Sequence, residues 1–331
     1  MMGKHTSCWV VTEGLKGLQN QAIGLAQALG LPYVYKEVMR PKNVWRMLPA
    51  SYWPDPLSLS IESQGFSPPW PDVLISCGRC SVAVSLALKK ASAGKIFTVH
   101  IQDPRMDPGK FDIVISPLHD HLHGKNVYMT QGAIHHITTE KLINAARHFS
   151  PLLASLPRPT IAVLVGGRNK RQEFSSVPAQ DFVNKLSAAA LSVHGGLAIT
   201  MSRRTDPAIE QILRQGLKGS PTYFWDGQTE NPYLGLLALA DVIIVTSDSI
   251  SMISEACFTG RPVYVYELPG IGKRHKQFLD NLIQKGIVRS FLGKIEKWKY
   301  QPLDETQRAA DFVREKFFAK MPFESQLCSS H

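Results

Sequence analysis

The chain has 331 residues, a length that predicts two domains. Hydrophobic residues make up 44% and charged residues 19%, a balance typical of a globular protein. No apolar run approaches the ~20 residues of a membrane-spanning helix, and the first residues lack a signal-peptide core, so a cytoplasmic location is expected. The formal net charge of +10 favours anionic partners. Because the cations are dispersed, we expect a peripheral contact with an anionic membrane or a lipid-linked acceptor, and no nucleic acid.

Five cysteines are scattered along the chain, and only Cys77 and Cys80 lie close together, as C-G-R-C. That spacing fits a redox pair or half of a zinc site, but it also fits two reduced thiols packed where a strand turns into a helix. No second Cys or His pair at ligand spacing accompanies them, so we expect structural thiols.

Strand-like and helix-like segments alternate through the first half, which predicts parallel βαβ units with helices on both faces of a sheet. Strands are expected at residues 8–12, 33–38, 72–76, 95–101, 112–116 and 127–130, and helices at residues 20–29, 44–48 and 78–91.

Three prolines in residues 150–159 mark a break, after which the same scheme repeats. Strands are expected at residues 160–165, 197–201, 222–225, 242–245 and 263–266, and helices at residues 178–193, 206–214, 233–240, 250–260 and 304–320. The fold class expected is α/β, with two Rossmann-like doubly wound domains facing a cleft. Residues 1–152 form the acceptor-side domain, residues 160–303 the nucleotide-binding domain, and residues 304–331 a C-terminal helix and tail that crosses back to the first domain.

The stretch of residues 241–262 is the most informative in the chain. An apolar strand ends in T-S-D-S, and a helix follows, whose first-turn N–H groups and dipole favour a phosphate. Ser251 and Glu255 are four residues apart and share a helix face, where the carboxylate is placed to accept the hydroxyls of a ribose. An ordinary strand–helix unit with a serine cap is the alternative. The candidate donor-binding residues here are Ser247, Asp248, Ser249, Ser251 and Glu255.

Two further loops of the second half carry glycine and positive charge at strand ends. Gly166 and Gly167 would let the backbone approach a phosphate closely, with Arg168 and Lys170 supplying charge, although neither a Walker loop nor G-x-G-x-x-G is present. A tight turn with solvated cations is the alternative. In the next loop, Ser202 and Arg203 begin S-R-R-T, whose two arginines could clamp a diphosphate or could be solvated.

The loops of the first half offer groups for an acceptor. We expect acceptor-side contacts from Gly14, Gly17, Gln19, Gly78, Arg79 and Gln102. Asp103 follows a strand in H-I-Q-D-P-R and is the candidate general base for an acceptor hydroxyl, with a loop-capping role as the alternative.

Histidines cluster in the connecting loops at His119, His121, His123, His135 and His136. H-D-H-L-H is a plausible ligand set, but it has no Cys partner and no E-x-x-H helix. We therefore expect no metal, and no cofactor apart from a nucleotide-diphosphate sugar as substrate.

Over its whole length the chain resembles the mitochondrial-fission ELM (elongated mitochondria) family. The segments that carry the resemblance are VTEGLKGLQNQAIGLAQALG, SCGRCSVAVSLALKK, VHIQDPR, TQGAIHHIT, VLVGGRNK, ITMSRRT and TSDSISMISEACFTGRPVYVYELPG. The resemblance implies a link to organelle division in plant members and a predicted sugar-nucleotide activity in some bacterial members.

The second half is also similar to the donor domain of GT-B glycosyltransferases, in particular the lipid-linked N-acetylglucosaminyltransferase of peptidoglycan synthesis. That resemblance implicates Gly166, Gly167, Ser251 and Glu255 in donor binding. The turn here is GGRNK, whereas the peptidoglycan enzyme has a different Gly-rich turn, and its Gln-rich acceptor signature is absent.

The function expected is an inverting, metal-independent GT-B glycosyltransferase in which cations and a helix dipole stabilise the leaving diphosphate. The alternative is a non-catalytic ELM-family adaptor in membrane or organelle division. An epimerase of the short-chain dehydrogenase kind is disfavoured, because G-x-x-G-x-x-G and Y-x-x-x-K are missing.

Overall fold

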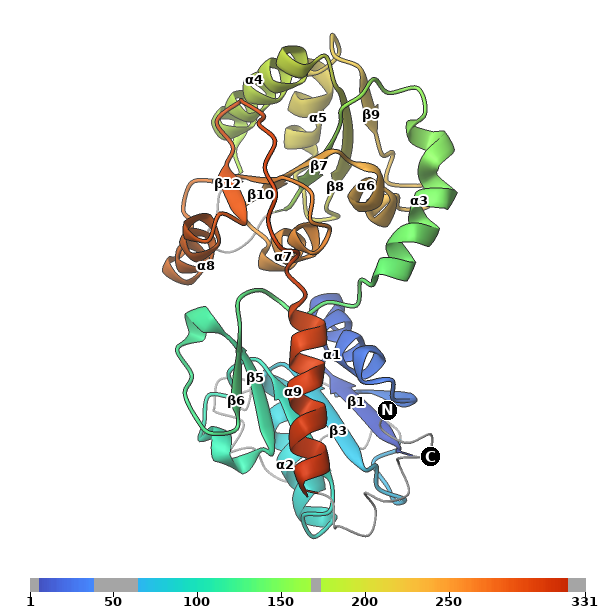
Figure 1. Cartoon of the computed structure of the whole chain (residues 1–331), viewed down its shortest axis with the longest axis vertical. Coiled ribbons are helices and arrows are strands. Elements are labelled where there is room, and N and C mark those ends of the chain that lie inside the picture. The colour runs from blue at the N-terminus through green and yellow to red at the C-terminus, as the bar shows by residue number, and fades with distance from the viewer. Residues whose placement is uncertain (1–5, 39–64, 168–173, 321–331) are drawn as a thin grey trace. The chain divides into compact units, whose positions relative to one another are not determined.

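The computed structural model describes residues 6–38, 65–167 and 174–320. These residues form two units (Figure 1). Unit 1 comprises the described residues of Met1–His136 and Asp304–His331, and unit 2 those of Ile137–Leu303. The division falls earlier than the expected boundary at residue 152, because helix α3, Thr139–Leu153, packs against α6, Tyr233–Leu239, in unit 2.

Unit 1 contains a parallel six-stranded sheet in the order β2-β1-β3-β4-β5-β6. This is the flavodoxin-like order with one strand added, so the winding reverses between β1 and β3. The strands are β1 Cys8–Thr12, β2 Tyr33–Glu37, β3 Val73–Cys77, β4 Phe97–Ile101, β5 Ile113–Pro117 and β6 Val127–Thr130. The helices are α1 Lys16–Leu29, α2 Arg79–Ala91 and α9 Glu305–Lys320, with short 3-10 turns at Pro108–Lys110 and Leu118–Asp120.

The central strands of unit 1 are covered on both faces, which explains their nearly continuous apolar sequences. Every residue of β1, β3 and β4 is buried. Leu25 and Leu29 of α1 share a core cluster with Val313 and Phe317 of α9. Although α9 follows unit 2 in the chain, it lies beside α1 in unit 1 (Figure 1).

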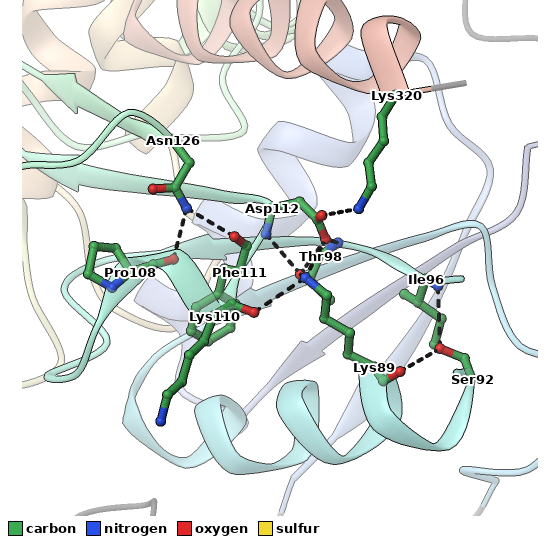
Figure 2. Close-up of polar contacts among 10 residues, drawn as sticks. All are labelled: Lys89, Ser92, Ile96, Thr98, Pro108, Lys110, Phe111, Asp112, Asn126 and Lys320. Carbon is green, nitrogen blue, oxygen red and sulfur yellow. Dashed lines mark hydrogen bonds and ion pairs between the residues drawn. The ribbon is translucent and has the colours of Figure 1, made fainter. Parts of the chain in front are cut away.

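A half-buried aspartate, Asp112, joins α9 and α2 to the amino ends of β4 and β5. Asp112 accepts hydrogen bonds from the backbone N–H and the hydroxyl of Thr98, both at 2.8 Å, and from Nζ of Lys89 at 2.9 Å, and it also pairs with Lys320 (Figure 2). Burial alone would raise its pKa, but these donors outweigh burial and hold the pKa of Asp112 below its usual value.

The same arrangement occurs before two other strands. Asp72 accepts the backbone N–H of Ser7 at 2.8 Å, and Asp241 accepts the backbone N–H of Thr160 at 2.8 Å. Each carboxylate thereby joins the start of its own strand to the start of a neighbouring strand.

Unit 2 contains a second parallel six-stranded sheet, in the order β12-β11-β10-β7-β8-β9. Counted within the unit this is the Rossmann order, with the winding reversed between β7 and β10. The strands are β7 Thr160–Val165, β8 Gly196–Met201, β9 Thr222–Phe224, β10 Val242–Thr246, β11 Val263–Tyr266 and β12 Val288–Ser290. Beyond α3 and α6, the helices are α4 Ser176–Val193, α5 Pro207–Gly216, α7 Ile250–Phe258 and α8 Lys273–Gln284.

Two core clusters lie on the two faces of this sheet. Phe182 and Leu186 of α4 belong to one cluster, and Ile253 and Cys257 of α7 belong to the other, with Ile250 partly buried beside them. These residues of α7 therefore form the apolar face by which the helix packs on the sheet. Both units are doubly wound α/β domains, as predicted.

Three elements differ from the expectation. The helix α3 was not predicted, because few of its side chains are buried and Pro151 lies inside it. The helix α8 was not predicted either, because its charged start, K-R-H-K, precedes the apolar spacing of Phe278, Leu279 and Leu282. The strand β12 was not predicted because it is only three residues long. The helix expected at residues 44–48 lies outside the described residues.

The described cysteines are free and buried: Cys8, Cys77, Cys80 and Cys257. Burial raises the pKa of the Cys77 thiol, which disfavours the thiolate needed for redox chemistry or metal binding. The C-G-R-C pair therefore packs as structural thiols at the end of β3 and the start of α2. Separately, none of the described helices is long and apolar enough to cross a membrane.

Candidate functional site

Three loops of unit 2 meet where the winding of the sheet reverses. They follow β7, β8 and β10, and two hydrogen bonds join them: Gly166 N–H donates to Oγ1 of Thr246 at 2.8 Å, and Oγ1 of Thr205 donates to the Gly166 carbonyl at 2.8 Å. In open α/β sheets ligands bind beyond the carboxyl ends of the strands at such a reversal. The structure thus brings together the loops in which the sequence placed the donor-binding residues.

The two glycines after β7 are needed for close packing within the protein. A Cβ on Gly166 would lie 1.9 Å from a carboxylate oxygen of Asp248, and a Cβ on Gly167 would lie 2.4 Å from the backbone carbon of Arg204. Gly167 N–H donates to Oδ2 of Asp248 at 3.0 Å. Both N–H groups donate to protein acceptors, so the two glycines help to join the three loops. A close approach of this backbone to a phosphate stays a prediction.

Asp248 is the acceptor around which the loops are organised. It is 7% exposed, and its Oδ1 accepts the hydroxyl of Thr246 at 2.6 Å. Burial raises the pKa of Asp248, while its hydrogen-bond donors and the charge of Arg204 act in the opposite direction. A carboxylate with a raised pKa can take up a proton when an anion approaches, which reduces the repulsion between the two.

The N-terminus of α7 lies at the same edge of the sheet. Ser249 is its N-cap, and the Ser249 hydroxyl accepts the backbone N–H of Met252 at 3.3 Å. Ser247 is buried, and its hydroxyl accepts the N–H of Leu268 at 2.9 Å, so it joins the β10 loop to the β11 loop. Ser251 is partly exposed in the first turn. The cap is a neutral hydroxyl, and the first turn of α7 contains no acidic residue, so the helix dipole at this end favours an anion.

Glu255 lies one turn further along α7 and is buried, with 7% exposure. Its Oε2 accepts a hydrogen bond from the hydroxyl of Tyr233, the first residue of α6. Burial raises the pKa of Glu255 to about 7, and the Tyr233 hydrogen bond lowers it in part. Within the described residues Oε1 makes no hydrogen bond, so one oxygen of the carboxyl group keeps its capacity to accept.

The β8 loop supplies positive charge next to these groups. Ser202 accepts the N–H of Arg204 through its hydroxyl at 3.2 Å, and the backbone of Arg204 packs on Gly167. Arg203 is exposed beside it. Two cations expected in the β7 loop, Arg168 and Lys170, lie outside the described residues.

In unit 1, the loop after β1 and the first turn of α1 contain three of the expected acceptor-side residues. Gly14 has φ of 73°, and a Cβ there would lie 2.1 Å from a carboxylate oxygen of Glu37. A Cβ on Gly17 would have nothing within 4 Å. Nε2 of Gln19 donates to the hydroxyl of Tyr35 at 2.7 Å, so this amide is occupied by a structural contact.

The loop after β3 places Gly78 and Arg79 at the start of α2. Gly78 has φ of 93°, and its backbone approaches Leu18 and Glu13 closely. Oε1 of Glu13 accepts the N–H of Cys80 at 3.1 Å, in the first turn of α2. The carboxylate of Glu13 therefore already lies at this helix N-terminus. The sequence analysis assigned no role to Glu13.

The loop after β4 contains Gln102 and Asp103. Gln102 has φ of 84°, and its N–H donates to the Ile115 carbonyl at 2.8 Å. Oδ1 of Asp103 accepts the N–H of Arg105 at 2.8 Å, and Oδ2 lies 3.2 Å from Nε of Arg105. These contacts are those of a loop-capping aspartate, the alternative weighed for this residue. A base role for Asp103 stays a prediction.

No group of three or more metal-ligating side chains occurs among the described residues. Two residues that sequence reasoning missed, Tyr233 and Thr205, contact the site residues directly. A periodicity-based interpretation places Tyr233 at the start of a helix but carries no signal that it reaches Glu255, because the two are 22 positions apart in the chain.

Solved structures with a similar fold include UDP-GlcNAc 2-epimerase from Methanocaldococcus jannaschii (12% identical, 95% of this chain and 100% of that chain, TM-score 0.57). UDP-GlcNAc 2-epimerase from Neisseria meningitidis, bound to UDP-GlcNAc, is similar over 95% of this chain and 100% of that chain (12% identical, TM-score 0.56). The glycotransferase of kitacinnamycin is similar over 94% of this chain and 98% of that chain (13% identical, TM-score 0.52). These likenesses show the two-domain GT-B fold. Because epimerases share this fold, the missing short-chain dehydrogenase motifs do not separate an epimerase from a transferase.

Two curated relatives cover nearly the whole chain. The mitochondrial fission protein ELM1 of Arabidopsis thaliana is 28% identical over 94% of this chain and 91% of its own length. An uncharacterised protein of Rickettsia prowazekii (strain Madrid E) is 27% identical over 92% of this chain and 97% of its own length. The sequence model of the family described as Mitochondrial fission ELM1 matches residues 16–317. The chain therefore belongs to the mitochondrial fission ELM1 family.

Proposed function

We propose that unit 2 binds a nucleoside-diphosphate sugar at the carboxyl ends of β7, β8 and β10, and that the protein transfers the sugar to an acceptor hydroxyl. The observation that carries the proposal is the meeting of these three loops at the reversal of the sheet, beside a helix N-terminus capped by Ser249. A protein of the same fold is bound to UDP-GlcNAc, which supports a uridine nucleotide as the first ligand to test.

The diphosphate is assigned to the first turn of α7 and the arginines of the β8 loop. Arg203 is exposed, and Arg204 interacts electrostatically with Asp248, so both cations belong to the same loop cluster. Guanidinium groups bind phosphate oxygens in pairs, and the helix dipole adds to this attraction. Ser251, partly exposed in that turn, offers a hydroxyl donor.

The ribose is assigned to Oε1 of Glu255. Tyr233 occupies Oε2 and holds the carboxyl group in one orientation, so a ribose hydroxyl meets a fixed acceptor. Glu255 was expected to accept both hydroxyls of the ribose. With Oε2 occupied by Tyr233, only Oε1 is left to accept them.

In the transfer step the acceptor oxygen forms a bond to the anomeric carbon, and the bond from that carbon to the diphosphate oxygen breaks. The electron pair leaves with the nucleoside diphosphate, whose developing charge is stabilised by Arg203, Arg204 and the α7 dipole. The acceptor proton passes to a base, for which Asp103 is the candidate, and Arg105 would have to release it.

Calorimetry on the full chain with UDP-GlcNAc, UDP-glucose, GDP-mannose and UDP tests binding. We expect micromolar affinity for one nucleotide, weakened by at least about tenfold in Ser251→Ala and Glu255→Gln. Glu210→Gln, on the exposed face of α5, is the matched control and should bind as the parent does. If no nucleotide binds, the proposal is wrong.

A second function is favoured by the family itself, since the Arabidopsis relative is named a mitochondrial fission protein. In this alternative the chain is a non-catalytic adaptor in membrane or organelle division. Product analysis with a bound UDP-sugar distinguishes the cases: a transferred sugar supports the transferase, an altered sugar supports an epimerase, and binding without turnover supports the adaptor.

A further inference from the structure

A cavity of about 850 Å³ lies at the amino ends of β7, β10 and β11. Its wall includes the residue immediately before each strand: Pro159, Asp241 and Pro262. Residues 295–299, which follow β12, the end of α4, and Arg158, Val242, Gly260 and Arg261 form the rest of the wall. Because the candidate nucleotide site is at the carboxyl ends of the same sheet, this cavity lies at the opposite edge. Its volume is typical of small-molecule sites.

The acidic groups of this cavity are already neutralised. Oδ1 and Oδ2 of Asp241 accept hydrogen bonds from Nη1 of Arg158 at 3.1 and 2.9 Å. Glu296 forms an ion pair with Arg289, and its backbone N–H donates to the hydroxyl of Tyr264 at 2.6 Å. Each carboxylate of the wall therefore has its own arginine.

The other cations of the wall have no such partner. Within the described residues, the side chains of Arg261, Lys297 and Lys299 form neither an ion pair nor a hydrogen bond, and all three are exposed. Three uncompensated positive charges at one cavity favour a ligand group with more than one negative charge. Arginine binds phosphate oxygens in pairs, and lysine adds point charge.

The remainder of the wall is apolar. Pro159, Val193, Val242, Pro262 and Ile295 contribute, together with the indole of Trp298. That ring is held in place by Tyr264, edge-on at 5.0 Å, and by the Arg289 guanidinium 4.4 Å from its centroid. An inorganic anion would leave these surfaces in contact with water, whereas a ligand with an apolar body would cover them.

We propose that this cavity is a second ligand site, which binds an organic phosphate monoester whose body is aromatic or aliphatic. The phosphate contacts Arg261, Lys297 and Lys299, and the body lies against Pro262, Ile295 and Trp298. The site shares no residue with the proposed nucleotide site, so the two ligands bind together.

Calorimetry on the full chain with phenyl phosphate, 1-naphthyl phosphate and octyl phosphate tests the site. We expect at least one of them to bind with a dissociation constant below about 1 mM, and inorganic phosphate and benzyl alcohol each to bind at least about tenfold more weakly. Saturating UDP-GlcNAc should leave the affinity unchanged. Absence of binding by all three monoesters, or displacement by the nucleotide, overturns the proposal.

Variants locate the ligand. The double variant Arg261→Gln, Lys297→Gln should weaken monoester binding by about tenfold or more. The single variant Lys297→Glu, which reverses one charge, should also weaken it. Lys294→Gln lies in the same segment but not in the cavity wall, and Ser251→Ala lies in the nucleotide site; neither should change monoester affinity by more than about twofold. Equal binding by the double variant and the parent would overturn the assignment. Arg261, Lys294 and Lys297 are exposed and Ser251 is partly exposed, so circular dichroism should show folded variants.

Discussion

In unit 1 and in unit 2, a helix begins beside the reversal of a parallel sheet, but the two helix N-termini differ in charge. In unit 1, Oε1 of Glu13 accepts the N–H of Cys80 in the first turn of α2. In unit 2, α7 is capped by the neutral hydroxyl of Ser249, and the carboxylate of Asp248 is bonded to Thr246 and Gly167 instead. A protein anion thus compensates one helix dipole and leaves the other for a ligand. This difference favours unit 2 over unit 1 as the place of the proposed anionic donor.

The glycines should give the largest effect on stability. Gly166→Ala places a methyl group against Asp248 and should destabilise unit 2 by more than about 3 kcal/mol, since the loop cannot move without breaking its hydrogen bonds. Gly17→Ala in α1 meets nothing within 4 Å and should stabilise unit 1 by about 0.5–1 kcal/mol, because Ala is the better helix former. Urea denaturation followed by unit-specific hydrogen exchange measures both. Equal effects would contradict the difference in packing.

Glu255 should make unit 2 less stable as the pH rises. Its folded-state pKa of about 7 is above the ordinary glutamate value of 4.5. The stabilisation from the protonated form is therefore complete below about pH 4.5 and is lost as the pH rises through about 7. The parent should lose about 3 kcal/mol relative to Glu255→Gln between pH 4 and pH 8. Denaturation of both proteins across this range checks the sign, and a constant difference would show that Glu255 is not buried as an acid.

Asp112 provides the corresponding test in unit 1, with the opposite pH dependence. Asp112→Asn should cost about 2 kcal/mol at pH 7, because a charged acceptor of bonds from Thr98, Lys89 and Lys320 is lost. Since the pKa of Asp112 is lowered, its contribution is present above the usual carboxyl range and disappears as the pH falls through the folded-state value. Lys110→Gln is a nearby control, and an unchanged unfolding midpoint for Asp112→Asn would contradict the account.

The helix caps should give the smallest effects on stability and separate the units most clearly by ligand binding. Ser249→Ala should cost unit 2 about 1 kcal/mol and weaken nucleotide binding. Glu13→Gln should cost unit 1 about 0.5 kcal/mol through the α2 dipole and leave nucleotide affinity unchanged. Calorimetry of the two variants side by side measures their nucleotide affinities. Weaker nucleotide binding by Glu13→Gln would indicate that the anion binds to unit 1 and would contradict the assignment to unit 2.

The sequence predicted the alternation of strands and helices because buried parallel strands read as continuous apolar runs, as in V-I-I-V of β10. It did not predict that the two sheets have different strand orders, since pairing partners lie far apart in the chain. The sequence also placed the candidate residues in loops at strand ends, and three of these loops meet in the structure. It did not predict the contact of Gly167 with Asp248, because the two residues are 81 positions apart.

The aspartates at the amino ends of the strands follow a sequence pattern that hydrophobic periodicity alone does not detect. Asp72, Asp112 and Asp241 each stand directly before an apolar strand, and each accepts a backbone N–H from a neighbouring strand start. The pairing of Tyr233 with Glu255 had no such signal, because it depends on how α6 and α7 pack on the sheet.

A crystal structure of the full chain grown with UDP tests the central claim most directly. We predict the diphosphate at the first turn of α7, within hydrogen-bond distance of Ser251 and the arginines of the β8 loop, and the ribose beside Oε1 of Glu255. Density for the nucleotide at the α2 N-terminus of unit 1, or a crystal at saturating UDP with none bound to unit 2, would contradict it.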